Sequence, residues 1–374
     1  MRQLVLPIAI SFGVYLFFNR LYNMSIPTQQ KALVLPEPHA PFALRTVEVY
    51  KPGAGEALVR VEATALNPLD WKIQKWNFFI KEYPAVIGTD IAGTVVQLGE
   101  GVTNVAVGDK IVFQGFFDNR LTSFQQYTIA KTDIVAKIPP NTSFEQAATI
   151  PVAAGAAFVG LYGPKQESGG ANLTPPWVEG GRGKYADQPI VIFGGSSSVG
   201  QYVIQLAKLS GFSPIITTVS LRKSDHAKSL GATHTIDRTL SSSDIVAEVK
   251  KITSKPVQIV YDPIAEEDTQ NTAYDILAPG GTLVLTLAPK IAKGKISKDK
   301  TIIDTLGNAH VEHNHALAIG FYGHLTEYLA SGALKPNDVE LLPGGLEAIP
   351  KGLERLKSGA VHAKKLVVRP TETA

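Results

Sequence analysis

The glycine-rich stretch GGSSSVG, residues 194–200, constrains the fold of this chain more than any other feature of its sequence. It follows an apolar run with strand composition, Ile190–Phe193, and precedes a segment whose apolar residues recur at helical spacing until Gly211. Further apolar strand runs follow, separated by helical segments, and they read PIITTVS (214–220), IVYDPI (259–264) and GGTLVLTL (280–287). This alternation predicts an α/β fold with a doubly wound parallel sheet, the Rossmann arrangement.

The part of the chain before this region has a different pattern. Between Lys31 and Pro139, short runs with strand composition at 57–66, 92–99 and 109–115 alternate with turn residues. These runs predict a compact and mostly antiparallel β domain. The final run, Val361–Arg369, also has strand composition and is expected to return to this first domain.

The position of the glycine-rich turn points to a dinucleotide. A turn between a strand and a helix N-terminus exposes backbone N–H groups and the positive end of a helix dipole, which together can hold a pyrophosphate. The middle glycine of the usual fingerprint is replaced here by Ser197. Because this turn lies within a βαβ pattern, the sequence predicts pyrophosphate binding by Gly195, Ser196, Ser197, Ser198, Val199 and Gly200.

The end of the second strand favours one nicotinamide cofactor over the other. NAD sites usually place a carboxylate there to hold the ribose 2′-hydroxyl, whereas this strand ends at Val219 and Ser220 and is followed by Arg222 and Lys223. A hydroxyl and two cations suit a 2′-phosphate, so we predict NADP(H). The alternative is that these are residues of a helix N-terminus that simply face solvent.

Composition excludes several other classes of protein. The chain has 36 Lys and Arg against 33 Asp and Glu, a formal charge of +3 that argues against a nucleic-acid partner. It has no cysteine, which removes disulfides, thiolate nucleophiles and every cysteine-containing zinc site. A chain without cysteine is compatible with the cytoplasm, where we place it.

Residues 1–23 form an apolar N-terminal extension or anchor. The run Leu4–Phe18 would cover about 23 Å as a helix, short of a hydrocarbon core of roughly 30 Å. An anchor that contacts a membrane through residues 4–18, a mis-joined extension and a secretion signal are the three interpretations. Met24 opens a sequence that leads directly into the first strand, so we expect the fold to be independent of residues 1–23.

A long segment before the glycine-rich turn interrupts the pattern. Residues 163–188 contain six glycines, three prolines and few large aliphatic residues, which predicts a surface insertion. The expected domain boundaries place the first part of the catalytic domain at 24–155, the NADP-binding domain with this insertion at 156–310, and the return to the catalytic domain at 311–374.

Several motifs, in this order, resemble the zinc-independent medium-chain dehydrogenase/reductase superfamily: VIGTDIAGTV (86–95), AATIPVAAGAAF (147–158), VIFGGSSSVG (191–200), SLGATHTID (229–237) and KKLVVRP (364–370). NPLDWK (67–72) and the long insertion are similar to the fungal trans-acting enoyl reductases and related GroES-like alcohol dehydrogenase-like proteins. The resemblance covers Lys31 to Pro370 and implies a GroES-like β domain joined to a Rossmann domain.

The resemblance also implies roles for individual residues. The loop of Asn67 and Lys72 would approach the nicotinamide, Ser196–Val199 would hold the pyrophosphate, and Ser220 with Lys223 would match an adenosine-phosphate pair. Ile264 and Val361 would match backbone contacts to the cofactor. Arg238 stands where the family commonly has a tyrosine, and its guanidinium could stack on adenine or pair with the 2′-phosphate.

Two differences from other branches of the superfamily bear on mechanism. Zinc-dependent relatives carry Gly-His-Glu where this chain has Gly88, Thr89 and Asp90, so the motif cannot supply a catalytic zinc site. Mitochondrial-type enoyl reductases have a catalytic tyrosine upstream of this motif, where this chain has Asn77, Phe78 and Phe79. The proton donor is therefore not identified by the resemblance.

A histidine cluster offers the other candidate metal site. His310, His313 and His315 lie close together in NAHVEHNH, without a clear helix or hairpin to aim them. We interpret this stretch as a polar loop that re-enters the first domain, and we predict no metal.

These patterns predict an NADPH-dependent, zinc-free reductase of an activated C=C bond, with Lys72 and Asn67 as catalytic candidates. The alternatives are an NADPH:quinone oxidoreductase and a non-catalytic NADPH-binding partner of a synthase. The substrate would be a small, apolar, conjugated molecule, and the protein a monomer or homodimer. Phe113, Phe116 and Phe117, with residues 155–162, are expected to form pocket walls.

Overall fold

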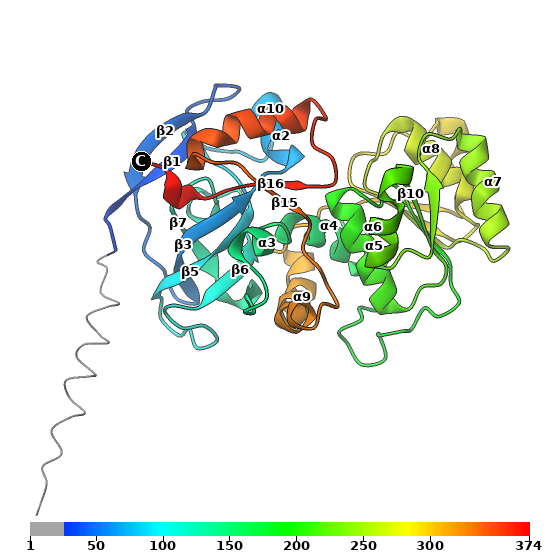
Figure 1. The fold of residues 1–374 in the computed structure, drawn as a ribbon, viewed down its shortest axis with the longest axis horizontal. Helices are drawn as coiled ribbons and strands as arrows, with labels where there is room; N and C mark the ends of the chain where they lie inside the picture. Colours follow the sequence, from blue (N-terminus) through cyan, green and yellow to red (C-terminus); the bar gives the residue numbers. More distant parts are fainter. Residues whose placement is uncertain (1–25) are drawn as a thin grey trace, which may run out of the picture.

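The structure is a computed structural model that describes residues 26–374. It has two lobes, with helix α4 (Pro151–Tyr162) between them (Figure 1). The expected N-terminal anchor at residues 4–18 lies outside the described residues. Across 26–374, no helix combines the length and the apolar character that crossing a membrane requires.

The first lobe is built from two β-sheets. A three-stranded sheet has the order β2-β1-β4, and a larger one has the order β15-β16-β3-β5-β6-β8, with β7 paired to β3. All pairs are antiparallel except β15 with β16. The strands are β1 (Gln29–Leu35), β2 (Ala43–Glu48), β3 (Glu56–Ala65), β4 (Ala85–Val86), β5 (Asp90–Leu98), β6 (Lys110–Gln114), β7 (Tyr127–Lys131), β8 (Val135–Lys137), β15 (Val339–Leu341) and β16 (Lys365–Val368).

The predicted mostly antiparallel β domain is therefore confirmed, with β3, β5 and β6 at the three expected strand positions. The predicted return of the C-terminal run is also confirmed, since Val367 of β16 pairs with Ala65 of β3. Strand β16 thus completes a sheet that begins some 300 residues earlier in the chain.

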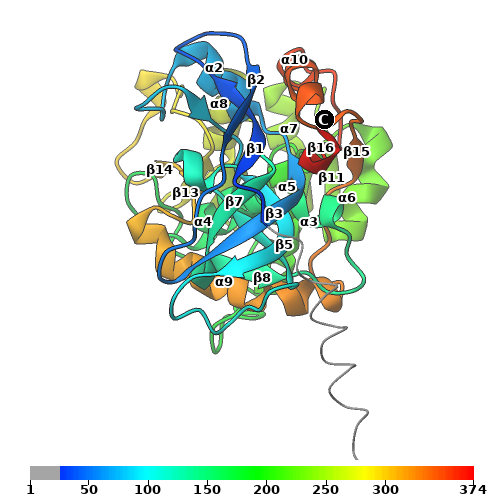
Figure 2. The same ribbon diagram turned by 90° about the vertical axis from the view of Figure 1, so that its left-hand side faces the viewer.

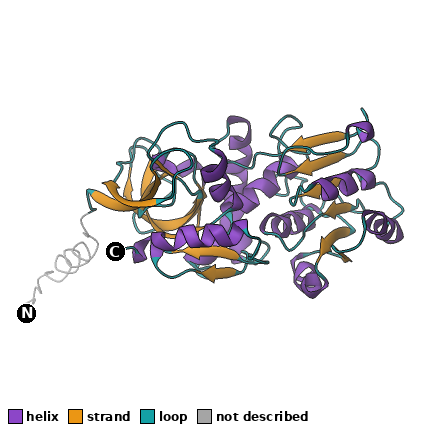
Figure 3. Cartoon of the chain, turned by 90° about the horizontal axis from the view of Figure 1, so that it is seen from above, coloured by secondary structure: helices purple, strands orange, loops and turns teal. Residues whose placement is uncertain are grey.

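The second lobe contains a six-stranded parallel sheet with the order β11-β10-β9-β12-β13-β14, the strand order of a Rossmann fold. Its strands are β9 (Ile190–Ile192), β10 (Ile215–Val219), β11 (His234–Asp237), β12 (Ile259–Asp262), β13 (Thr282–Leu285) and β14 (Thr301–Asp304). The doubly wound sheet is confirmed, although the sequence did not predict β14. Figure 3 shows its strands between helices.

Alternation along β9 explains why both faces of this sheet are covered. Ile190 and Ile192 belong to a buried cluster with residues of α4 and α5, whereas Val191 belongs to a separate cluster with residues of α7 and α8. The helices of the described chain are α2 (Pro68–Trp76), α3 (Phe144–Ala148), α4, α5 (Ser198–Ser210), α6 (Ser224–Leu230), α7 (Ser242–Ile252), α8 (Glu267–Ile276), α9 (Glu312–Ala330) and α10 (Ile349–Lys357).

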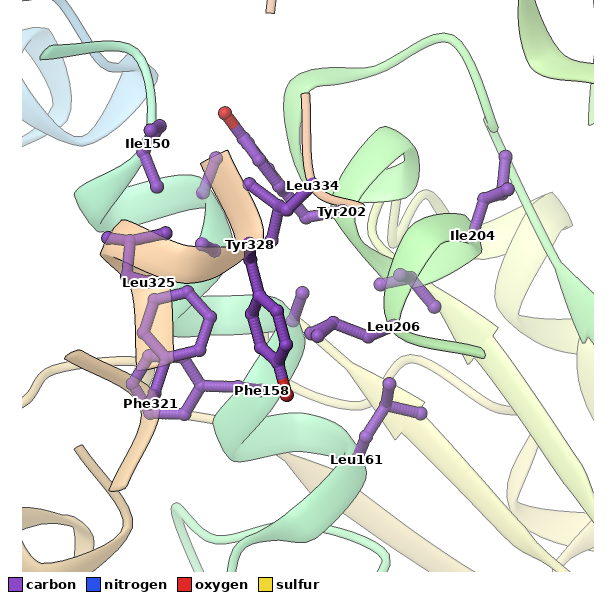
Figure 4. Close-up of a cluster of buried hydrophobic side chains, with 14 of the residues drawn as sticks. Ile150, Phe158, Leu161, Tyr202, Ile204, Leu206, Phe321, Leu325, Tyr328 and Leu334 are labelled. Atoms are coloured by element: carbon purple, nitrogen blue, oxygen red, sulfur yellow. The ribbon is translucent and has the colours of Figure 1, made fainter. Parts of the chain in front are cut away.

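The two lobes share the hydrophobic cluster around α4, α5 and α9 (Figure 4). Phe158 of α4 stacks on Phe321 of α9, with ring centroids 4.6 Å apart. Small residues let α4 approach its neighbours closely, since a Cβ on Gly160 would lie 2.4 Å from the hydroxyl of Tyr261. Helix α9 also packs under β8 of the first lobe (Figure 2), so one core joins the two lobes.

Residues 163–188 form no helix or strand, and the segment uses aromatic side chains to pack on this core. Trp177 lies edge-on to Tyr162 with ring centroids 5.2 Å apart, and Tyr185 stacks on Phe212 at 4.8 Å. The insertion is therefore packed onto the protein through aromatic side chains, a feature that its glycine-rich composition did not predict.

Candidate active site

A cleft of about 520 Å³ lies at the carboxyl ends of the parallel strands. Its walls come from the turn after β9, the segments after β10, β11 and β12, the start of α8, and the loop before β16. In open parallel sheets, ligands bind at this edge, where the strand order reverses. The predicted site residues that line it are Ser196, Ser197, Ser220, Arg222, Lys223, Arg238, Ile264 and Val361.

Close backbone packing explains the glycines of the turn after β9. A Cβ on Gly195 would lie 2.2 Å from Thr217 Oγ1, and a Cβ on Gly200 would lie 2.4 Å from the carbonyl oxygen of Gly194. Gly194 itself has a φ of +60° and donates its N–H to Thr218 Oγ1 at 2.9 Å. The turn is therefore held against β10 in a shape that larger residues would not fit.

Ser197 occupies the place of the missing glycine as the N-cap of α5. Its hydroxyl accepts a hydrogen bond from the N–H of Gly200 at 3.0 Å. The N–H groups of Ser198 and Val199, which follow it in the first turn, have no acceptor within a helix. This geometry fits an anion at the N-terminus of α5.

Three cations lie on one side of the cleft. Arg222 and Lys223 belong to a short 3₁₀ turn after β10, and Arg238 directly follows β11. Among residues 26–374, none of these three cations takes part in an ion pair. Glu266 and Asp268 line the cleft as well, so it carries carboxylates in addition to the cations.

A buried polar cluster, which the sequence did not reveal, surrounds Asn67. Its amide Nδ2 donates to Asp90 Oδ2 at 2.9 Å, and its Oδ1 accepts from Lys365 Nζ at 2.6 Å. Lys365 Nζ also lies 3.0 Å from Asp90 Oδ2, and both side chains are at most 4% exposed. The other Asp90 oxygen accepts the N–H of Val152 in the first turn of α4. The cluster thus ties β5, β16, α2 and α4 together.

Asp70 completes this polar cluster. Its Oδ2 accepts the backbone N–H of Asn67 at 2.7 Å, and the residue is buried. The pKa of the Asp70 carboxyl is raised to about 7, first by burial and also by the neighbouring Asp90 carboxylate, against the lowering effects of the hydrogen bond from Asn67 and of Lys365.

The two residues predicted as catalytic differ in their surroundings. Asn67 is 3% exposed, and both polar atoms of its amide are paired within the buried cluster. Lys72 is half-buried, and its ammonium lies 5.8 Å from the ring of Trp71 and 6.0 Å from that of Trp76. Neither residue lines the cleft described above. The structure therefore does not place them with the pyrophosphate-binding candidates.

The histidine cluster is not a polar loop throughout, because α9 begins at Glu312 and includes His313 and His315. The three rings have separate partners, which are the carbonyl of Gln114 for His310, the carbonyl of Ser168 for His313 and the carboxylate of Asp133 for His315. No group of three or more potential metal ligands occurs within residues 26–374.

The prediction that Phe113 forms a pocket wall is wrong. Phe113 is 2% exposed and packs in the core of the β domain, because it faces inward on β6. Most of the segment 155–162 is likewise buried within α4. Phe116 and Phe117, by contrast, are only half-buried and lie beyond the end of β6.

A mostly antiparallel β domain joined to a Rossmann domain with a glycine-rich turn defines a class of two-domain oxidoreductases. Residues 53–140 match the alcohol dehydrogenase GroES-like domain, and residues 198–311 match the zinc-binding dehydrogenase domain. The trans-enoyl reductase himH of Aspergillus japonicus is 37% identical over 244 residues, which are 63% of this chain and 67% of that protein.

Solved structures show the same fold. The quinone oxidoreductase of Coxiella burnetii has a TM-score of 0.67 and 25% identity, covering 91% of this chain and 99% of that one. A mycobacterial protein solved with NADPH has a TM-score of 0.71 and 21% identity, covering 91% and 100%. The chain belongs to the medium-chain dehydrogenase/reductase superfamily and is an oxidoreductase.

Proposed function

We propose that this protein is an NADPH-dependent, zinc-free reductase that transfers hydride to an activated C=C bond of an enoyl or enone substrate. The observation that carries the proposal is the cleft at the carboxyl edge of the parallel sheet, with Ser220, Arg222 and Lys223 after β10. The trans-enoyl reductase relative supports the choice of acceptor.

The residues of the cleft suit NADPH. The first turn of α5, with Ser196 and Ser197, would bind the pyrophosphate through N–H and hydroxyl groups. Ser220, Arg222 and Lys223 would bind the 2′-phosphate, and Arg238 would lie beside the adenosine. Ile264 and Val361 would contact the cofactor from the segments that follow β12 and precede β16. NADPH, when bound, supplies the hydride.

We assign different roles to the two catalytic candidates. Because its amide is fully paired, Asn67 would act as a positioning residue that fixes the start of α2. Burial lowers the pKa of the Lys72 ammonium, which brings it nearer to the range useful for donating a hydrogen bond or a proton. Lys72 would therefore donate a hydrogen bond to a polar group of the bound substrate.

A quinone is the second candidate acceptor. The fold shared with the Coxiella burnetii quinone oxidoreductase favours a quinone as the acceptor. An acceptor panel decides between the two: purified protein is mixed with NADPH and with enones, enoyl thioesters or quinones, and NADPH oxidation is followed. Turnover of enones or enoyl thioesters supports our proposal, and turnover of quinones alone contradicts it.

The cofactor preference is expected to depend on Lys223. Replacing Lys223 with alanine should weaken NADPH binding by about 1.5 to 3 kcal/mol, since one charged partner of the 2′-phosphate is lost, and should leave NADH binding unchanged. Calorimetric titration with both cofactors measures this. The exposed Lys250 of α7 provides the matched control, Lys250→Ala. An unchanged preference for NADPH in Lys223→Ala would show that the phosphate lies elsewhere.

Activity is expected to survive exhaustive chelation. Since the chain has no cysteine and carries Thr89 in place of a ligating histidine, hydride transfer should not need zinc. Turnover before and after dialysis against a strong chelator, together with elemental analysis, checks this. One tightly held zinc per chain, with activity lost on its removal, would contradict the zinc-free mechanism.

A further inference from the structure

Six aromatic side chains form a continuous row on one side of the first lobe. We name Trp71, Trp76, Phe78, Phe79, Phe117 and Phe116, in this order, the aromatic row. Successive ring centroids lie between 4.8 and 6.4 Å apart, and the rings of Phe79 and Phe117 are stacked with an angle of 6° between their planes. These separations are those of rings in contact.

The inner end of the row reaches the junction of the two lobes. The ring of Phe116 lies 5.4 Å from that of His310, whose Nε2 is 2.8 Å from the carbonyl oxygen of Gln114. Gln114 in turn holds Gly307 and Ala309 by hydrogen bonds of 2.9 Å each. His310 is therefore fixed just beyond the carboxyl end of β14.

This place in the sheet lies on the nicotinamide side. The cations that suit the 2′-phosphate follow β10 and β11, on one side of the central strand β9. A dinucleotide bound across the carboxyl edge therefore extends its other half toward β12, β13 and β14. The row leads from that half of the site outward along α2 and the segment after it.

Two rings within the row are open to solvent. Trp76 is 53% exposed and Phe79 is 42% exposed, which places both among the exposed large apolar side chains within residues 26–374. Burying these rings in the core would have been favourable, by about 25 cal/mol for each Å² removed from water. Exposed aromatic rings in a contiguous row mark a binding surface.

We propose that the aromatic row binds the apolar body of an extended, flat, conjugated acceptor, whose reactive C=C bond lies at the inner end. The inference rests on the proposed function and adds that the protein selects acceptors by the length of their conjugated chain. A flat π-system can stack on successive rings, and the row continues directly from the nicotinamide half of the site. Trp76 and Phe79 are then specificity-determining residues.

Binding by a length series of acceptors tests this inference. The probes are methyl ketones with one, two and three conjugated double bonds, titrated by calorimetry into protein loaded with NADP⁺. The expected affinity rises about fifteenfold with each added double bond, the gain for burying two methylene-sized groups. In Trp76→Ala and Phe79→Ala the rise with length is expected to disappear. Val107→Ala is the control, since Val107 is as exposed as Trp76, at 53%, but lies outside the row.

The same samples separate the inference from the proposed function. Turnover of the ketones with NADPH reports on the reductase, whereas the dependence of affinity on length reports on the row. An affinity that does not rise with length in the unmodified protein overturns the inference, even if every ketone is reduced. A rise that persists in both Trp76→Ala and Phe79→Ala overturns it as well. A rise lost only in these two variants supports it, whether or not turnover is seen.

Discussion

Replacing Lys365 with methionine is expected to lower the free energy of unfolding by about 3 to 5 kcal/mol. The change removes the ammonium that lies 3.0 Å from Asp90 Oδ2 and 2.6 Å from Asn67 Oδ1. Asp90 is 0% exposed, so water cannot replace the lost partner, and a carboxylate would remain in the interior with two hydrogen bonds alone. Equilibrium unfolding in denaturant, followed by circular dichroism, measures the loss.

Two further variants define the cause of this loss. Lys364 is exposed and precedes Lys365, so Lys364→Met should change the stability by no more than about 0.5 kcal/mol. Adding Asp90→Asn to Lys365→Met should recover part of the stability, because the unpaired charge is removed. If the double variant were as unstable as the sum of the two single variants, the charge pair would not be the source of the effect.

Asp70 is expected to make stability fall as the pH rises from about 4 to about 7. Its carboxyl has a folded pKa of about 7 against an ordinary value of 3.8, with burial as the first cause. A raised folded pKa means that the folded state holds the proton more tightly than the unfolded state does. The resulting stabilisation is complete below the unfolded pKa and is lost as the pH rises through the folded pKa. The change amounts to about 1.4 kcal/mol for each pKa unit.

The variant Asp70→Asn isolates this contribution. An asparagine can still accept the N–H of Asn67 but does not ionise. The free energy of unfolding of the Asp70→Asn variant, relative to that of the unmodified protein, should therefore increase between pH 4 and pH 8. Unfolding curves at each pH, with the exposed Asp225→Asn as control, measure the difference. A difference that stays constant across this range would show that Asp70 keeps an ordinary pKa.

Much of the fold could be predicted because local patterns specify it. The strand, glycine turn and helix at 190–211 satisfy short-range rules of periodicity and capping, and the structure has β9 and α5 there. Strand β14 was missed because TIID is only four residues long and follows a lysine-rich loop. Helix α9 was not predicted, because the histidines of NAHVEHNH at its start obscure the apolar spacing that follows.

The candidate site was predictable to the extent that its parts are local. Ser196, Ser197, Ser220 and Lys223 lie at strand ends, and a parallel sheet brings strand ends to one edge. The pairing of Asn67 with Lys365 could not be read in this way, because the two residues are separated by 298 positions. A lysine in the short apolar run KLVV of β16 was the one available signal that this strand buries a charge.

The pairing of β3 with β16 has a consequence for how the protein is made. Synthesis proceeds from the N-terminus, so β3 leaves the ribosome long before its neighbour β16 exists. During that interval the edge of β3 that β16 will cover is exposed, and Asp90 lacks its ammonium partner. The parallel sheet of residues 190–304, by contrast, has all of its strands available earlier. The second lobe can therefore fold while the chain is still growing, whereas the first lobe is completed only after β16 has been made.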